Sequence, residues 1–340
     1  MQWVKGAWRW VNALCGTGRP IGLVRRGLWG ILFAIALTLS LVFQACGGDT
    51  LTDNSPLTGD DSTTSLENRN PTEADSPPEK DALDDALDQE HSGDKPDATP
   101  IAMVEPAVPV TGEAVTYATV NGESVTGYLA RPTNPDSETL PALITIHEWW
   151  GLNDNIEAMA RRLAGEGYTV LAIDLYDNQI ATDPNQARDF MRGVMDAPGP
   201  AQDNINQAAD FLKTEYNAPA LGSIGWCFGG NWSLRTGLLL TSELDAMAIY
   251  YGQLILAPEA LDGLDMPIIG FFGEEDSSIP VQDVNNFEEI LTNLGKDVDI
   301  HLYPDTGHAF ANPSGQNYDE AAAEDAWEKT TAFFAEHLQS

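Results

Sequence analysis

The chain contains little cysteine and little positive charge for its length. Its 340 residues include only three cysteines, too few for a disulfide framework. Lysine and arginine number 17 against 52 aspartates and glutamates, which gives a net charge of −35. Phosphate backbones repel such a chain, so nucleic-acid binding is excluded as its function. Histidines and cysteines at the spacing of metal-ligand clusters are also missing, and we expect no metal or organic cofactor.

The charge is distributed unevenly, and its distribution predicts three regions. Residues 1–48 contain five basic residues and no acidic one, whereas residues 49–100 contain 15 acidic and 3 basic residues. The acidic stretch has no Phe, Trp or Tyr and buries too little apolar surface to offset the entropy of ordering. We therefore expect an export signal over residues 1–45, an acidic disordered tether over 46–100 and a folded domain over 101–340.

The N-terminal region has the features of an export signal. Arg25 and Arg26 precede an uncharged, mostly apolar run of sixteen residues, Leu28–Phe43, which is short for a membrane-spanning helix. The run ends before Ala45-Cys46, which resembles a bacterial lipoprotein signal in which Cys46 carries the lipid. An uncleaved signal anchor is the alternative. Both interpretations predict an exported, membrane-attached protein in the periplasm or at the cell surface.

The region after residue 100 alternates strand-like and helix-like segments. Asn121-Gly122 lies between two strand-like segments and predicts a β-hairpin, because type I′ turns need positive φ at both central residues. Apolar runs alternating with amphipathic stretches predict an α/β fold with a mostly parallel sheet and helices on both faces. The expected strands are Ala114–Val120, Ser124–Ala130, Ala142–His147, Thr169–Asp174, Gly222–Gly225, Ala246–Tyr251, Ile268–Phe272 and Val298–Tyr303. The expected helices are Ile156–Ala164, Gln186–Met195, Ala201–Tyr216, Gly230–Leu240, Val281–Leu294 and Glu320–Leu338.

The central chemical signal is Gly225-Trp-Cys227-Phe-Gly229 between an expected strand and an expected helix. This Gly-x-Cys-x-Gly pattern is typical of a nucleophile elbow with sulfur in place of oxygen. Cys227 would lie at a helix N-terminus, where the positive end of the helix dipole favours a thiolate. The amide of Phe228 would point at a developing oxyanion. A small buried cysteine in a glycine-rich turn is the alternative.

Two further residues follow successive strands in the order expected of an α/β-hydrolase. Asp276 comes after Ile268–Phe272, and His308 comes after Val298–Tyr303. A thiol needs a base close by, and an imidazole needs an acceptor that fixes its tautomer. His91 lies in the expected tether, His301 in a strand and His337 on the last helix, and for these three we expect structural roles only.

The loop after the first apolar strand adds Glu148 in the run His147-Glu148-Trp149-Trp150-Gly151. A carboxylate at this corner is costly to bury without a partner or a task. The amide of Trp149 is a candidate for the second oxyanion donor, the usual contribution of this loop.

These motifs together resemble the dienelactone hydrolase (carboxymethylenebutenolidase) family of the α/β-hydrolase superfamily. The resemblance covers about residues 112–338. It implies a Cys227–His308–Asp276 triad, with Glu148 helping to ionise the thiol when substrate enters. It also implies oxyanion donors at Trp149 and Phe228 and a pocket residue at Tyr176.

One position departs from the pattern of that family. The family binds a substrate carboxylate with arginines, one of them four residues after the catalytic histidine, and Asn312 stands there in this chain. Arg188 or Arg192 is a candidate for another pocket arginine, and Trp150 and Trp226 are candidates for an aromatic pocket lining. Losing a cationic clamp favours a neutral lactone or simple ester as substrate.

We therefore expect a hydrolase that cleaves a small-molecule lactone or carboxylic ester through a thioacyl-enzyme intermediate. A broad-specificity carboxylesterase is one alternative. A membrane-tethered surface lipoprotein that keeps the fold without catalysis is the other.

Overall fold

The structure is a computed structural model that describes residues 89–91, 93–100, 102–135, 137 and 139–339. The predicted export signal (1–45), the predicted lipidation site Cys46 and the predicted tether up to residue 88 lie outside the described residues. In the part of the chain that is described, no helix is both long and apolar enough to cross a membrane.

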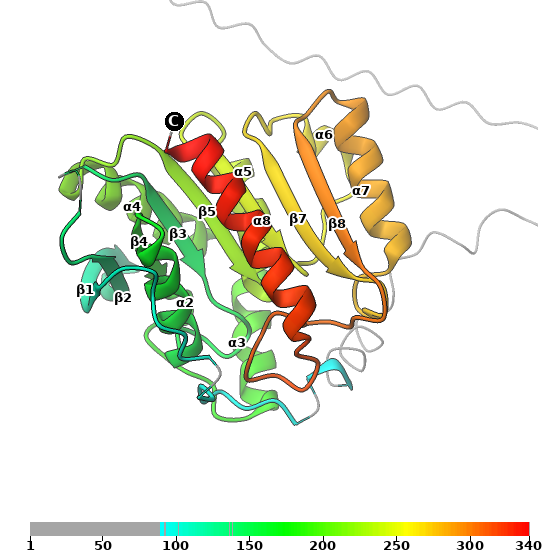
Figure 1. Cartoon of the computed structure of the whole chain (residues 1–340), viewed down its shortest axis with the longest axis horizontal. Coiled ribbons are helices and arrows are strands. Elements are labelled where there is room, and N and C mark those ends of the chain that lie inside the picture. Colours follow the sequence, from blue (N-terminus) through cyan, green and yellow to red (C-terminus); the bar gives the residue numbers. More distant parts are fainter. Residues whose placement is uncertain (1–88, 92, 101, 136, 138, 340) are drawn as a thin grey trace, which may run out of the picture. The chain divides into compact units, whose positions relative to one another are not determined.

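A sheet of eight strands lies at the centre of the described chain (Figure 1). The strands are β1 (Val110–Val120), β2 (Glu123–Pro132), β3 (Ala142–Ile146), β4 (Thr169–Ile173), β5 (Leu221–Trp226), β6 (Ala246–Tyr250), β7 (Ile268–Gly273) and β8 (Val298–Tyr303). Their order across the sheet is β1-β2-β4-β3-β5-β6-β7-β8. Strands β3 to β8 pair in parallel, whereas β2 pairs antiparallel with both β1 and β4. The predicted mostly parallel sheet is confirmed.

Helices cover both faces of this sheet. They are α2 (Asp154–Gly165), α3 (Pro184–Asp196), α4 (Gly199–Glu215), α5 (Phe228–Leu239), α6 (Pro258–Leu261), α7 (Val281–Asn293) and α8 (Glu320–Leu338). In Figure 1, α2 and α8 lie in front of the sheet, while α4 and α5 pack against its opposite face. The short helix α6 was not expected from the sequence. Among the described residues, the fold is therefore the predicted α/β-hydrolase arrangement.

The parallel strands are hydrophobic because both of their faces are covered. All residues of β3, β4, β5, β6 and β7 are buried, whereas the edge strand β8 is half-exposed. Burying an aliphatic side chain such as Leu143 or Ile144 contributes about 1.5–3 kcal/mol. The Tyr250 hydroxyl fixes α8 on the sheet through Thr330 Oγ1 at 2.6 Å. The core thus holds the carboxyl ends of the strands in a fixed arrangement.

Strands β1 and β2 pair on either side of Asn121-Gly122. Both turn residues have positive φ, 53° at Asn121 and 87° at Gly122, as a type I′ turn requires. The register places Val120 opposite Glu123.

Residues 89–91 and 93–100, here called the covering segment, lie against the domain. Pro96 O accepts a hydrogen bond from Asn153 Nδ2 at 2.7 Å, and the Thr99 amide donates to Ser314 Oγ at 2.8 Å. The expected disorder of this part of the tether is corrected by these contacts. Its composition predicted disorder because it lacks apolar area, but it is held by hydrogen bonds instead. Figure 1 shows it in cyan at the edge of the sheet toward which the arrows of β5 and β7 point.

Candidate active site

Cys227 is the single residue between the end of β5 and the start of α5. Its backbone has φ 56° and ψ −116°, an uncommon conformation for a residue with a side chain and one that costs about 1–3 kcal/mol. A Cβ at Gly225 would lie 2.0 Å from Gly229 O, and one at Gly229 would lie 2.2 Å from Ile146 O. Both glycines are therefore needed for the strand to turn sharply into the helix. The turn presents the sulfur at the carboxyl edge of the sheet, as the sequence predicts.

His308 and Asp276 meet beside this sulfur. His308 Nδ1 lies 2.7 Å from Asp276 Oδ2, and both side chains are buried. Asp276 Oδ1 accepts from the backbone amides of Ser278 (2.8 Å) and Ile279 (3.0 Å), which fixes the orientation of the carboxylate. The Nδ1–H donated to Asp276 leaves His308 Nε2 as the atom available for chemistry. Nε2 is buried and has no hydrogen-bond partner among the described residues.

The electrostatics of the site favour an ionised thiol. Burial raises the pKa of the Cys227 thiol, but the charge of His308 and the contact with His91 outweigh it, and the pKa falls to about 6. Burial lowers the pKa of His308, but the charges of Asp276 and Cys227 raise it well above its usual range. A thiolate beside an imidazolium is consequently the favoured pair of protonation states near neutral pH.

Glu148 follows β3 and is held at its corner by the preceding histidine. His147 Nδ1 lies 2.6 Å from Glu148 O, while His147 Nε2 accepts from the Leu175 amide at 3.1 Å. Burial lowers the pKa of His147 to about 4, so the ring is neutral and keeps one tautomer. The sequence did not indicate this role for His147; its place at the end of a buried strand was the available signal.

The Glu148 side chain points toward Asn312 and the thiol. Glu148 Oε2 accepts from Asn312 Nδ2 at 2.6 Å. Burial and the charge of Cys227 raise the pKa of Glu148 to about 8. Asn312 stands at the position of the family's arginine, and its side-chain amide is hydrogen-bonded to Glu148. A cavity of about 10 Å³ lies next to these two residues, and Trp226 also lines it.

The two predicted oxyanion donors are the backbone amides of Trp149 and Phe228. Among the described residues, no hydrogen-bond acceptor is found for the backbone N–H of Trp149 or of Phe228. The Cys227 amide, in contrast, donates to Tyr250 O at 3.0 Å. The amides of Trp149 and Phe228 therefore remain available to an oxygen that develops negative charge.

The aromatic residues predicted to line the pocket are packed into the core. Trp150 and Trp226 are almost fully buried, and the Tyr176 ring lies 5.3 Å from the ring of Phe228. Arg188 and Arg192 are half-buried on α3, where Arg188 donates to Asn185 Oδ1 at 3.2 Å. Two of these five are close to the thiol: Trp226 directly precedes Cys227 in the chain, and Tyr176 packs on Phe228, which follows it.

His91, which the sequence assigned to the disordered tether, lies directly over the thiol. Its Nε2 is 3.7 Å from Cys227 Sγ, its Nδ1 is 2.9 Å from Asp94 Oδ2, and its side chain is 2% exposed. The ring stacks on Trp149 with 4.2 Å between centroids. The expectation of a purely structural tether histidine is therefore corrected. The spacing of His91 and Asp94, three residues apart, was the only local signal.

A ring nitrogen of His91, a ring nitrogen of His308 and Cys227 Sγ all lie within 4.8 Å of one another. Direct proton transfer needs hydrogen-bond distances of about 2.6–3.2 Å, so the groups must approach one another before a proton passes. The sequence brings these residues from three distant segments, so no spacing rule could have grouped them. The expected absence of a metal or organic cofactor stays a prediction.

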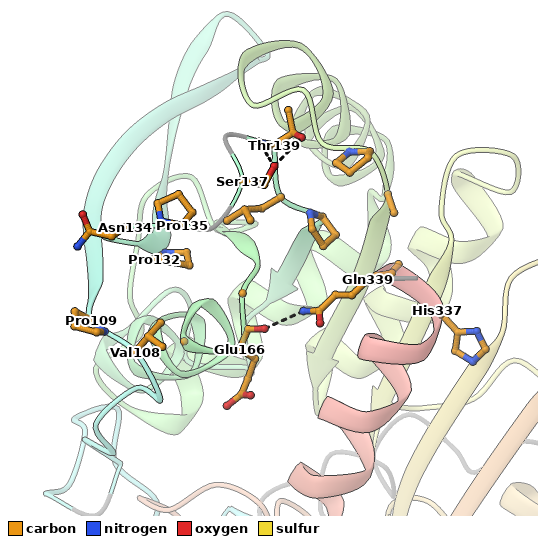
Figure 2. A pocket seen from close by; sticks show the side chains of 17 residues that line it. Val108, Pro109, Pro132, Asn134, Pro135, Ser137, Thr139, Glu166, His337 and Gln339 are labelled. Carbon is orange, nitrogen blue, oxygen red and sulfur yellow. Dashed lines mark hydrogen bonds between the residues drawn. The ribbon is translucent and has the colours of Figure 1, made fainter.

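A larger surface pocket, of about 730 Å³, lies at the opposite edge of the sheet (Figure 2). Pro132, Glu166 and Gln339 are among its lining residues, and Gln339 Nε2 donates to Glu166 O at 2.9 Å. It adjoins the amino ends of β3 and β5 and contains none of the predicted site residues. Although this pocket is larger than the cavity beside Glu148, it is not the candidate active site.

Comparison with known proteins agrees with this arrangement. Residues 125–338 match the model of the family described as "Dienelactone hydrolase family". "Protein usf" of Aquifex pyrophilus is 32% identical over 225 residues, covering 64% of this chain and 96% of the relative. A Saccharolobus solfataricus protein named "Putative carboxymethylenebutenolidase" is 30% identical over 249 residues, covering 63% and 94%.

A solved structure extends the likeness to three dimensions. The crystal structure titled as a dienelactone hydrolase candidate of Klebsiella pneumoniae superposes with a TM-score of 0.61 at 27% identity, covering 67% of this chain and 99% of that one. The span matched by the family model, residues 125–338, includes Glu148, Cys227, Asp276 and His308. The chain belongs to the dienelactone hydrolase family.

Proposed function

We propose that this protein hydrolyses carboxylic esters or lactones, with Cys227 as the nucleophile. One observation carries the proposal: the sulfur sits at a strand-to-helix elbow beside an imidazole that Asp276 orients at 2.7 Å. A positioned base and an acceptor that fixes its tautomer are what an acyl-transfer nucleophile requires. Family membership supports the same chemistry.

The reaction runs in two halves. The Cys227 thiolate attacks the carbonyl carbon, and the amides of Trp149 and Phe228 bind the oxyanion, where one such donor is worth about 3 kcal/mol. The carbon–oxygen bond breaks, and the leaving alkoxide takes a proton from His308 Nε2 to become the alcohol. A water molecule then gives a proton to His308 and attacks the thioester. Collapse releases the acid and restores the thiolate.

We infer that the substrate is neutral at the end that enters near Asn312. Asn312 donates to Glu148 at 2.6 Å and carries no charge with which to hold a carboxylate. An arginine at such a position forms two charge-assisted hydrogen bonds, which an amide cannot replace. Neutral lactones and simple esters are therefore the proposed substrate class.

Substitution and alkylation of Cys227 test the proposal. We expect Cys227→Ala and treatment with iodoacetamide each to abolish turnover of p-nitrophenyl acetate and of neutral lactones. His337→Gln, on α8 away from the thiol, is the matched control and keeps full activity. Turnover that survives both treatments would show that the cysteine is not the nucleophile. A folded wild-type protein that turns over no member of an ester and lactone panel would support the non-catalytic alternative.

A further inference from the structure

Two histidine–carboxylate pairs face the same sulfur. His308 with Asp276 is one of them, and His91 with Asp94 is the other. In both pairs the carboxylate accepts from Nδ1. Nε2 of His91 therefore faces Cys227 Sγ, at 3.7 Å. A single base suffices for an acyl-transfer triad, so the second pair has no role in the mechanism above.

The second pair is held in place by the loops that carry the first. Glu90 accepts from the amide of Ser277 at 2.9 Å and from the Ser277 hydroxyl, directly after Asp276. Asn317 Nδ2 donates both to Glu90 Oε2 (3.3 Å) and to His308 O (3.0 Å). Asp94 Oδ1 accepts from the Gln316 amide at 2.9 Å. The position of His91 over the sulfur is thus fixed by several contacts and not by one.

The charges around the sulfur favour a proton on His91. The titratable groups around Cys227 and its two histidines come from several elements. They are His91, Asp94, Glu148, Tyr176, Tyr251, Asp276 and His308. Burial lowers the pKa of His91, but the hydrogen bonds with Asp94 and Cys227 raise it to about 9. Glu148, with its pKa raised to about 8, is mostly protonated near neutral pH.

We propose that His91, held by Asp94, is a second imidazolium partner of Cys227 that keeps the thiol ionised before substrate arrives. The proton leaves Cys227 Sγ for His91 Nε2, while the Nδ1–H stays with Asp94, so no further reactant is needed. The inference rests on the proposed role of Cys227 as nucleophile. It gives the covering segment a role in ionising the thiol. The alternative is a segment that only excludes water from the site.

The pH dependence of alkylation measures this role directly. The full chain is treated with iodoacetamide from pH 4.5 to 10 in buffer containing EDTA, and mass spectrometry quantifies the peptide that contains Cys227. We expect half-maximal rate near pH 6 in the wild type. In His91→Gln the midpoint rises by about one unit or more, which slows alkylation at pH 5 about tenfold. His337→Gln, far from the sulfur, follows the wild-type curve.

A second variant separates the charge of His91 from the docking of the segment. Asp94→Asn keeps the imidazole and an oxygen for the Gln316 amide, and we expect it to move the midpoint in the same direction by a smaller amount. An unchanged midpoint in both variants overturns the proposal. So does faster alkylation of His91→Gln at every pH with the midpoint unchanged, which is the signature of a lid alone.

The measurement does not use an ester, so its outcome is independent of the proposed activity. If the protein proves not to hydrolyse esters, a shifted midpoint of thiol alkylation would still support the role of His91. Conversely, an active hydrolase with an unshifted midpoint would retain the proposed function and lose this inference.

Discussion

The two histidines beside Cys227 reach it by different routes. His308 and Asp276 follow β8 and β7, so the sheet itself brings them together. His91 and Asp94 belong to the covering segment, which is held by hydrogen bonds of Glu90, Asp94, Pro96 and Thr99 to neighbouring loops. The first pair is positioned by strands of the core, whereas the second depends on hydrogen bonds outside the sheet.

This difference teaches that residues outside the sheet can contribute to a site whose nucleophile the sheet positions. The core determines where the sulfur and its base lie. A segment outside the core can then change the protonation of the sulfur without changing the sheet. Each of the following experiments separates the contribution of one pair from that of the other.

The largest expected difference is in catalysis. His308→Gln removes the base of both half-reactions, and we expect kcat to fall about 10³-fold or more at every pH. His91→Gln removes only the partner that ionises the thiol, so kcat/KM falls about tenfold at pH 5 and recovers by pH 9, where the thiol ionises unaided. The measurement is kcat/KM against pH on a neutral ester. Equal losses for the two variants across the whole pH range would remove the distinction between the pairs.

A glycine-to-alanine comparison separates the two regions in stability. A Cβ at Gly273 would lie 2.1 Å from Thr306 O, a backbone atom, and we expect Gly273→Ala to lower the free energy of unfolding by about 3 kcal/mol. A Cβ at Gly93 would meet the flexible end of Gln316, so Gly93→Ala acts through its φ of +91° and costs about 1 kcal/mol. Urea unfolding measures both.

Gly193→Ala is the control for that comparison. It lies within α3 with nothing inside 4 Å of the added Cβ, and we expect it to stabilise the protein by up to about 1 kcal/mol. Equal costs at Gly273 and Gly93 would mean that the covering segment is as integral to folding as the sheet.

Glu148 belongs to neither pair, and its titration shows what the buried carboxyl itself contributes. Its pKa is raised from 4.5 to about 8 in the folded protein. As the pH rises above 4.5, the carboxyl therefore loses its proton in the unfolded chain before it does so in the folded one. The stability contribution is therefore full below pH 4.5 and is lost through pH 8. Glu148→Gln lacks this loss, and its stability relative to wild type rises by about 3–4 kcal/mol between pH 5 and pH 8.

Unfolding by urea at several pH values measures this difference. Glu105→Gln, an exposed substitution before β1, is the control and changes the pH dependence little. A constant difference between Glu148→Gln and wild type from pH 5 to pH 8 would show that Glu148 is ionised in the folded protein throughout.

The smallest effect is expected at the link between the regions. Glu90→Gln weakens the contacts to Ser277 and Asn317 but leaves both pairs intact. We expect a two- to fivefold fall in kcat/KM at pH 6, because a charged hydrogen bond near the surface is worth about 1 kcal/mol. Steady-state kinetics measure it, with Glu105→Gln again as control. No change would mean that Asp94, Pro96 and Thr99 hold the segment without Glu90.

The sheet and the first pair could be predicted from the sequence for a physical reason. Buried parallel strands read as continuous apolar runs, and their carboxyl ends lie at one edge, so Cys227, Asp276 and His308 could be placed together from chain order alone. The spacing of Gly225 and Gly229 marked the tight turn. These signals are local or follow from topology.

The second pair could not be predicted in this way. His91 lies in a stretch without aromatic residues and with abundant acid, where composition predicts disorder because it counts apolar burial and not hydrogen bonds. Asn312 shows the same limit: its place in the chain marked a lost arginine, but its bond to Glu148 depends on two loops far apart in the sequence. The environment of a polar side chain is set by tertiary contacts.

The cover over Cys227 also bears on the durability of the protein. A sulfur that ionises readily is the form that peroxide oxidises, first reversibly and then irreversibly. Cys227 is the free cysteine of the described chain, so no neighbouring thiol there can rescue a sulfenic acid. Cys227 is 5% exposed and His91 lies against its sulfur, so oxidants in solution have little access to the thiolate. The same contacts that surround the sulfur therefore also protect it from oxidation, which favours a long working lifetime.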